Sequence, residues 1–161
     1  MSSVYSDTIY QPSTCVDGVP PNPASGTNIC LSGVGVPDPW LAVELPGRSV
    51  VSEVVVYGRA DCCNSLLVDF EVWVGDTVGA PSVEAGWQLC GRNTGRLPDE
   101  ASVTTVSCGG RAGSVVSLRL PGASRTIMMS ELVVRGYPDL ASPPASPSPL
   151  PSPPPPSPGP S

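Results

Sequence analysis

The chain contains no histidine and no lysine, and these absences exclude several kinds of site. Without His, a protein lacks its usual general base at neutral pH, the Ser-His-Asp and Cys-His catalytic groups, and most zinc ligand sets. The eight basic residues are all Arg and face 14 acidic ones, which gives a net charge of −6. An acidic chain without a basic run argues against binding to nucleic acid or to an anionic membrane surface. We therefore expect no catalysis and no nucleic-acid partner.

Long apolar runs and helical periodicity are also missing. No apolar run approaches the roughly 20 residues that span a bilayer, so we expect no membrane insertion. Residues 1–15, MSSVYSDTIYQPSTC, lack the basic stretch followed by an apolar one that a secretory leader needs. Since other features below indicate secretion, we expect an excerpt of a longer secreted protein or an incomplete gene start. No long segment has apolar residues at helical spacing.

The composition changes sharply near residue 140. Residues 141–161 contain only Ala, Ser, Pro, Leu and Gly, and hold half of the chain's 22 prolines. This composition cannot bury a core and favours an extended polyproline II stalk. It resembles the Ser-Pro-rich stalks of hydroxyproline-rich wall glycoproteins in plants and green algae. An unmodified linker or a docking site for a proline-binding domain is the alternative. Residues 1–140 are expected to form one domain.

Short runs rich in Val and bounded by Gly, Pro, Asp and Asn predict β-strands in this domain. In one run, Phe70, Val72 and Val74 share a face, whereas Glu71 and Trp73 lie on the other, so Trp73 is expected to cover a second surface. Many short strands with turn signals between them predict an all-β antiparallel sandwich or barrel. The predicted strands cover residues 39–45, 49–60, 68–75, 101–108, 113–120 and 130–137.

Six cysteines in a chain without His indicate disulfides rather than a metal site. Disulfides in turn indicate an oxidising compartment, and reduced cysteines in an intracellular protein are the alternative. Spacing favours bridges across two Gly-containing segments, which leaves the two adjacent cysteines for each other. Sequence alone permits many other connectivities. The favoured pairs are Cys15–Cys30, Cys62–Cys63 and Cys90–Cys108.

The adjacent cysteines lie beside Arg59 and Asp61 in the stretch GRADCCNSLL (58–67). A disulfide between neighbours could exchange with thiols, and two free thiolates could begin a metal site, although they form an incomplete ligand set. A third role is a rigid apolar platform. The flanking residues favour this role, because a sugar offers hydroxyls at its edge and C–H groups on its face. Arg supplies a rigid fork of donors, and Asp can hold that fork through a charge-assisted pair.

At this point the sequence resembles a known family. GRADCCNSLLVDFEVWVGD (58–76) is similar to the signature of F-type lectins (fucolectins), which belong with discoidin or factor V/VIII type C domains. TCVDG (14–18), DPWLAVEL (38–45) and MSELVVRGY (129–137) are similar to further segments of the family in the same order. The likeness runs from about Tyr5 to Tyr137. It implies an antiparallel jelly-roll β-sandwich that binds carbohydrate, in an extracellular or cell-wall protein.

The resemblance also assigns roles at a sugar site formed by loops. Arg59 would hold hydroxyls, Asp61 would orient Arg59, and the ring formed by Cys62 and Cys63 would stack on the sugar face. Ser32 stands where the family has a His, and we keep it among the expected sugar contacts. Leu66 stands where the family has a second basic residue. Each charged hydrogen bond contributes about 1.5–3 kcal/mol, so losing two weakens fucose binding by a factor of hundreds or more.

Three interpretations follow from these departures. The first is a carbohydrate-binding module whose fucose-type site is partly degenerate. The second is a structural or adhesion module that has lost sugar binding. The third is an accessory binding domain of a larger wall-active protein.

A structural calcium ion is a further implication of the resemblance. The matching carboxylates are Asp17 and Glu131, and hard oxygen ligands of this kind suit Ca²⁺. The alternatives are a turn-forming role for Asp17 and a surface charge at Glu131. The family's late cysteine is Ser130 here, which is a second reason to pair Cys30 with Cys15.

Overall fold

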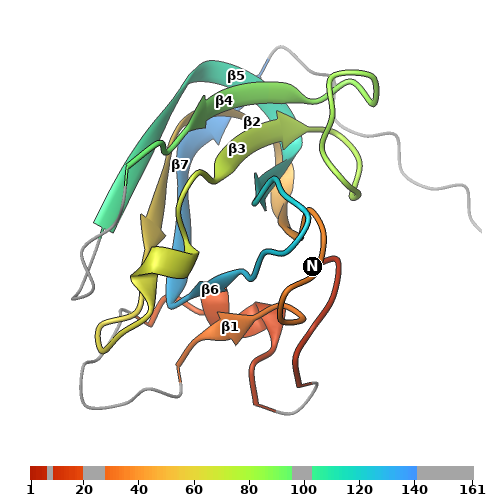
Figure 1. Ribbon diagram of the computed structural model, residues 1–161. Coiled ribbons are helices and arrows are strands. Elements are labelled where there is room, and N and C mark those ends of the chain that lie inside the picture. The colour runs from red at the N-terminus through yellow and green to blue at the C-terminus, as the bar shows by residue number, and fades with distance from the viewer. Residues whose placement is uncertain (7–8, 20–27, 96–102, 141–161) are drawn as a thin grey trace, which may run out of the picture.

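Two antiparallel β-sheets make up most of the computed structural model, which describes residues 1–6, 9–19, 28–95 and 103–140 (Figure 1). The larger sheet has the strand order β4-β3-β5-β2-β7, and the smaller one pairs β1 with β6. The expected all-β jelly-roll β-sandwich is confirmed, whereas the expected stalk at 141–161 lies outside the described residues. The strands are β1 (Cys30–Leu31), β2 (Trp40–Tyr57), β3 (Glu71–Gly75), β4 (Gln88–Arg92), β5 (Val103–Arg119), β6 (Met128–Met129) and β7 (Glu131–Pro138).

The helical content of the described residues is small. It consists of two short 3-10 helices, η1 (Pro12–Cys15) and η2 (Asn64–Leu66). Within these same ranges, no helix has the length and hydrophobicity that crossing a bilayer requires. The missing helical periodicity of the sequence therefore agrees with the structure.

The sequence predicted strand ends at two places where the strand in fact continues. At both places Pro or Gly residues lie in a β-bulge. The segments 39–45 and 49–60 join in β2, and the described part of 101–108 joins 113–120 in β5. The pairing of β2 with β5 shifts between Glu44 and Ser49, around Pro46 and Gly47, and again between Val51 and Glu53. Opposite the second shift, Gly109 and Gly110 have φ of 58° and 78°, which glycine adopts readily. A bulge of this kind bends a strand without ending it.

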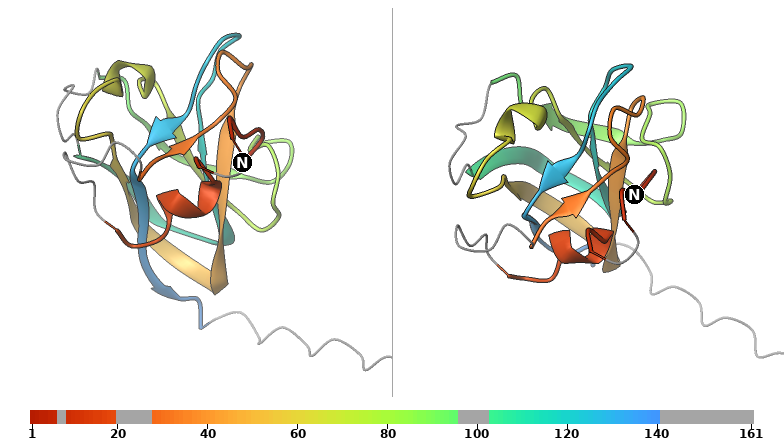
Figure 2. Two further views of the ribbon diagram at one scale, coloured as in Figure 1. Left: turned by 90° about the horizontal axis from the view of Figure 1, so that it is seen from below. Right: turned by 60° about the horizontal axis from the view of Figure 1, so that its bottom comes forward.

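Three short strands were missed, namely β1, β4 and β6. The two-residue strands β1 and β6 contain too few residues to show an alternating pattern. They exist because they pair with each other, with Cys30 opposite Met129 and Leu31 opposite Met128. Figure 2 shows them side by side, with η1 next to β1.

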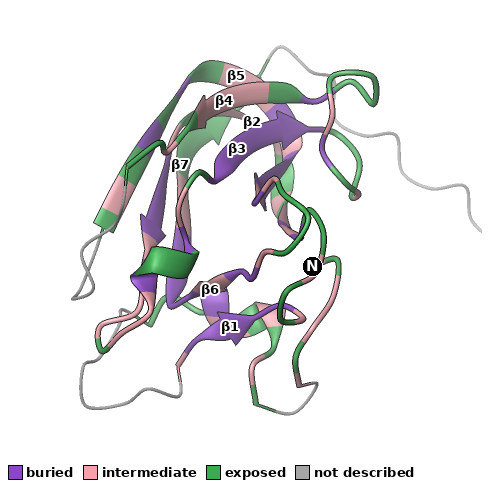
Figure 3. Cartoon of the chain, in the orientation of Figure 1, coloured by how far each residue is buried: buried purple, intermediate pink, exposed green. Residues whose placement is uncertain are grey.

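The core fills the space between the two sheets. Phe70, Val72 and Val74 point into it and are fully buried, as their alternation predicted. On the opposite face of β3, Trp73 packs with Trp87, so the second surface expected for Trp73 is also present. Gly75 is needed there because a Cβ atom would lie 2.6 Å from the Trp87 ring. In Figure 3, β1, β3 and part of β6 are buried, whereas Ser65 and Leu66 of η2 are exposed.

The six cysteines form three disulfides in the structure, and the pairs are those that spacing favoured. Cys15–Cys30 joins the end of η1 to β1, with both residues buried in the core. Cys90–Cys108 joins β4 to β5. Because η1 also packs against β7, the first disulfide holds the segment that follows Cys15 near the start of β7.

Candidate functional site

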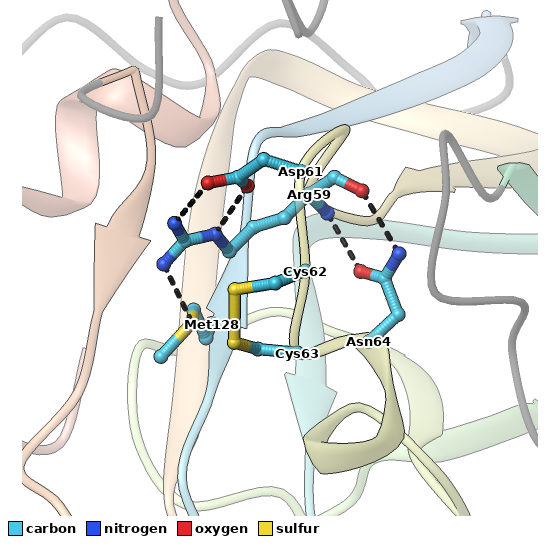
Figure 4. The surroundings of a disulfide bond; sticks show 6 residues. All are labelled: Arg59, Asp61, Cys62, Cys63, Asn64 and Met128. Atoms are coloured by element: carbon cyan, nitrogen blue, oxygen red, sulfur yellow. Dashed lines mark hydrogen bonds and ion pairs between the residues drawn. A yellow bond between two sulfur atoms is a disulfide. The ribbon is translucent and has the colours of Figure 1, made fainter.

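The loop between β2 and η2 carries Arg59, Asp61 and the Cys62–Cys63 disulfide, a group that we call the clamp (Figure 4). Its two ends are joined by the buried side chain of Asn64. The Arg59 amide donates to Asn64 Oδ1 at 2.7 Å, and Asn64 Nδ2 donates to the Arg59 carbonyl at 2.8 Å. Cys63 adopts φ of 70°, a left-handed conformation that a non-glycine residue keeps only where its surroundings enforce it. The side-chain amide of Asn64 thus holds the loop in one conformation.

The Arg59 guanidinium is held on two sides. Nε and Nη2 donate to the two carboxylate oxygens of Asp61 at 2.8 and 2.6 Å, which forms a bidentate ion pair. Nη1 donates to the sulfur atom of Met128 at 3.2 Å. A guanidinium has five N–H donors, so two remain without a partner among the described residues. The side chains of Arg59 and Asp61 are 16% and 35% exposed, so the pair is reachable from solvent.

Each member of this ion pair stabilises the charge of the other. The hydrogen bonds from Arg59 are the main reason why the pKa of Asp61 lies below its usual range. The Asp61 carboxylate in turn raises the pKa of Arg59, and Tyr10 is close enough to contribute to this rise. The clamp therefore keeps a positive donor fork and a negative anchor over the whole physiological pH range.

A second pair of ionisable groups, Asp17 and Glu131, lies where η1 meets the start of β7. Asp17 follows Cys15 by two residues, and its Oδ1 accepts the amide hydrogen of Val19. Glu131 is buried, and its Oε2 has no hydrogen-bond partner in the described structure. Burial, followed by the neighbouring Asp17 carboxyl group, raises the pKa of Glu131 to about 7.

These two carboxyl groups, of Asp17 and Glu131, are the residues that could hold a metal ion at this place. Two facing carboxylates with an orphaned buried oxygen lack a positive charge, which a proton or a hard cation such as Ca²⁺ can supply. Within the described ranges, no three His, Cys, Asp or Glu side chains gather around one point. Further ligands of an ion drawn from the described residues would therefore be backbone carbonyls, side-chain amides or hydroxyls, or water.

The sequence matches a family model for the F5/F8 type C domain, described as a NedA-like, galactose-binding domain, over residues 15–118. This match covers more than half of the chain. The chain belongs to the F5/F8 type C family. The family resemblance that R-x-D-C-C indicated is thus confirmed, and no curated protein sequence matches the chain.

Solved structures with the same fold include several carbohydrate-binding modules. A fucolectin from striped bass (Morone saxatilis) serum has a TM-score of 0.73 and 23% identity over 84% of this chain, which spans only 45% of that lectin chain. A fucose-binding module from Streptococcus pneumoniae has a TM-score of 0.63 and 18% identity, covering 85% of this chain and 91% of its own. A chitosan-binding module of a chitosanase/glucanase from Paenibacillus sp. IK-5 has a TM-score of 0.62 and 21% identity, covering 84% and 91%.

In this F5/F8 type C domain, the two residues that depart from the fucolectin pattern, Ser32 and Leu66, differ in their exposure to solvent. Ser32, an expected sugar contact, is fully buried, and its hydroxyl oxygen accepts the Ile127 amide hydrogen at 2.9 Å. That bond fastens the end of β1 to the segment before β6, so Ser32 has a structural role and offers no group to a ligand at the surface. Leu66, in contrast, is 42% exposed on η2, directly after the clamp.

Sequence reasoning about the domain missed three residues near the clamp. Asn64 had a usable signal, because an Asn at a loop end commonly bonds to nearby backbone groups. Met128 and Tyr10 had none, since they lie far from Arg59 in the sequence. β6 lies against η2, which brings Met128 beside the clamp.

Proposed function

We propose that this F5/F8 type C domain is a carbohydrate-binding module that holds a glycan non-covalently on the clamp. The observation that carries the proposal is the Arg59 guanidinium, fixed by two hydrogen bonds to Asp61 beside the Cys62–Cys63 ring. Its remaining N–H groups can donate charge-assisted hydrogen bonds to sugar hydroxyls. The ring supplies apolar surface for a C–H face. The fucose-binding and chitosan-binding neighbours support a sugar as the ligand class.

The clamp is suited to weak but specific binding because it is organised before the ligand arrives. Arg has a flexible side chain, and ordering it on binding costs about 0.5–1.5 kcal/mol. Asp61 and Met128 already hold the guanidinium, and Asn64 already holds the loop. Much of this cost is therefore met in folding rather than in binding.

The preferred sugar is expected to differ from L-fucose bound in the usual fucolectin manner. Ser32 is buried, and Leu66 brings an apolar group where the family has a cation. The same observation favours the second candidate, an adhesion or matrix module that has lost sugar binding. The Paenibacillus module, named as derived from a chitosanase/glucanase, is the precedent for an accessory domain of a larger wall-active protein.

Calcium binding is the second part of the proposal. Asp17 and Glu131 would hold the ion, and the orphaned Glu131 Oε2 is the feature that fits it best. Bound Ca²⁺ would neutralise both carboxylates and tie the end of η1 to the start of β7. The ion would thus have a structural role, stabilising the end of the sandwich where β1 and β6 meet the clamp.

An extracellular or cell-wall setting accords with these features. Three disulfides are typical of an oxidising compartment. The Ser-Pro composition of 141–161, outside the described residues, is that of a wall-protein stalk.

A glycan array probed with and without calcium tests the proposed function. We expect binding to a restricted set of glycans, stronger in calcium than in a chelator. Absence of binding to every glycan in both conditions would defeat the proposal and favour the adhesion module.

A further inference from the structure

A hollow of about 170 Å³ lies between β2 and β7, where β2 bends around Pro46 and β7 ends. We call it the β2–β7 groove. The clamp follows Tyr57 at the other end of β2, so the groove and the clamp lie far apart on the domain. Most of the lining is apolar, and its floor is formed in part by Val51, which is fully buried in the core. The lining residues used below are Leu45, Pro46, Val51, Val134, Tyr137 and Pro138.

A glycine in β7 keeps the groove open. By strand alternation, Val134, Gly136 and Pro138 lie on one face of β7. Gly136 pairs with Val51, and a Cβ atom on it would lie 2.3 Å from the carbonyl oxygen of Val50. Position 136 therefore has no room for a side chain, and the space between Val134 and Pro138 stays unfilled.

The rim of the groove carries rings and no charge. Pro46, Tyr137 and Pro138 are exposed, and Tyr137 is 60% exposed. None of the described lining residues is charged, although the chain as a whole has a net charge of −6. Exposed aromatic rings along a groove are the surface on which proline-rich segments dock, and the tyrosine hydroxyl is a donor for the carbonyl groups that such segments present.

The chain supplies a segment of this chemistry itself. Residues 141–161, outside the described residues, contain no charged residue and half of the chain's 22 prolines. Their composition favours a polyproline II conformation, in which no backbone carbonyl is used by an internal hydrogen bond. Small-molecule pockets begin at roughly 300 Å³. The smaller groove therefore suits a narrow segment that inserts one or two proline rings.

The end of β7 indicates which molecule supplies the segment. The Asp139 amide donates to the Arg48 carbonyl at 3.0 Å, and Arg48 Nε donates to Asp139 Oδ2 at 3.1 Å. These bonds fix Asp139 beside the groove, and Leu140 after it is 92% exposed. A proline-rich segment is stiff over several residues, and prolines already occur at 143 and 144. The segment is thus unsuited to turning back into the groove that it has just left, which favours the segment of another molecule.

We propose that the β2–β7 groove binds the Ser-Pro segment 141–161 of a second copy of this chain. The contact joins two different surfaces, so each copy can bind one neighbour through its groove and another through its segment. Contacts of this type build open chains of molecules. The proposal goes beyond carbohydrate binding and does not depend on it, because the clamp lies outside the contact.

Sedimentation velocity of the full chain, at rising concentration, tests this proposal. We expect the average mass to rise with concentration and to return to that of the monomer in an excess of a synthetic peptide of residues 141–161. The same peptide with every proline replaced by alanine should not compete. Tyr137→Ser should weaken the association about tenfold, through loss of the aromatic contact. Tyr5→Ser, at a tyrosine that is 59% exposed and lies outside the groove, is the matched control and should leave it unchanged.

Several outcomes would overturn the proposal. One is a chain that stays monomeric at every concentration. Another is an association that neither the peptide nor Tyr137→Ser weakens, or that Tyr5→Ser weakens equally, because the interface would then lie elsewhere. A third is a monomer whose Tyr137 ring resonances move when the prolines of its own segment are replaced by alanine. That result would place the chain's own segment in the groove instead of the segment of a second copy.

Discussion

Two carboxylate sites at the loop end of this domain are opposite in their electrostatics. Asp61 lies beside an arginine, and that cation holds its pKa below the usual range. Glu131 is buried beside Asp17, and its pKa is raised to about 7. Asp61 has both oxygens bonded to Arg59, whereas one oxygen of Glu131 has no partner in the described structure.

This difference shows which of the two sites is balanced in charge by the protein's own side chains. The clamp contains its own counter-charge, so it has its working geometry before any ligand binds. The Asp17–Glu131 pair is incomplete, because two carboxylates at close range cannot both ionise without cost. A proton can balance it at low pH, and the proposed Ca²⁺ would balance it at higher pH. The predictions below test this contrast, beginning with the largest expected effect.

The stability of the calcium-free domain should fall as pH rises. A carboxyl group whose folded-state pKa is raised contributes its full stabilisation below the unfolded-state pKa, here 4.5. That contribution is lost as pH rises through about 7, and the shift corresponds to roughly 3 kcal/mol. Urea unfolding in a chelator between pH 4.5 and 8 measures it. Glu131→Gln should flatten the dependence, whereas Glu84→Gln, an exposed control, should preserve it. A flat profile for the unmodified domain would contradict this reading of Glu131.

Calcium should reverse the loss at pH 8. A ligand that binds only the folded state at about 100 times its Kd stabilises it by roughly 2.7 kcal/mol. Thermal unfolding with added calcium should therefore shift upward, and Asp17→Asn and Glu131→Gln should each remove most of the shift. An equal calcium shift in both variants would place the ion elsewhere.

Asn64→Ala should loosen the clamp. The substitution removes two hydrogen bonds to the backbone of Arg59, which together contribute about 2 kcal/mol to stability. We also expect weaker glycan binding, because Cys63 would no longer be held in its left-handed conformation. Asn64→Asp keeps the acceptor but sets a buried carboxylate oxygen against the Arg59 carbonyl, so its loss of stability at neutral pH should be at least as large as that of Asn64→Ala. An Asn64→Ala variant as stable as the unmodified domain would show that the pair of bonds does not act as described.

Asp61→Asn should lower glycan affinity about tenfold and stability by less than about 1 kcal/mol, since an exposed ion pair contributes little to folding. The amide cannot accept both hydrogen bonds from the guanidinium, so Arg59 becomes less well oriented. In saturating calcium, the unmodified domain should keep its affinity as pH falls from 7 to about 5, because the pKa of Asp61 is lowered. Loss of binding within that range would argue against Asp61 as the anchor.

The sequence predicted the fold class well, because the signals for β-strands are local and recur along the chain. Alternation in β3 predicted the core face and the second surface of Trp73. The divisions within β2 and β5 were wrong, because Pro46 and the Gly109–Gly110 pair bend paired strands that tertiary contacts keep together. The strands β1 and β6 could not be predicted, since their pairing joins residues nearly 100 positions apart.

At the candidate site, neighbours in sequence were predicted and neighbours in space were not. Arg59, Asp61 and the two cysteines lie within five residues, so their contacts follow from one loop. Met128 comes from another element, and nothing in its own sequence context indicates a contact with a guanidinium. Ser32, expected at the sugar site, is buried, and the partner of its hydroxyl oxygen is the amide of Ile127, which lies far away in the sequence.

The most direct test of the clamp is the affinity of Arg59→Ala for the glycan that the array identifies. The matched control is Arg135→Ala, because Arg135 also forms an ion pair, with Glu53 at 2.7 Å on the main sheet. We predict that Arg59→Ala lowers affinity about a hundredfold, through loss of charge-assisted hydrogen bonds, while the domain stays folded. Arg135→Ala should leave affinity unchanged. Equal affinities for Arg59→Ala and the unmodified domain would contradict the assignment of the clamp as the carbohydrate site.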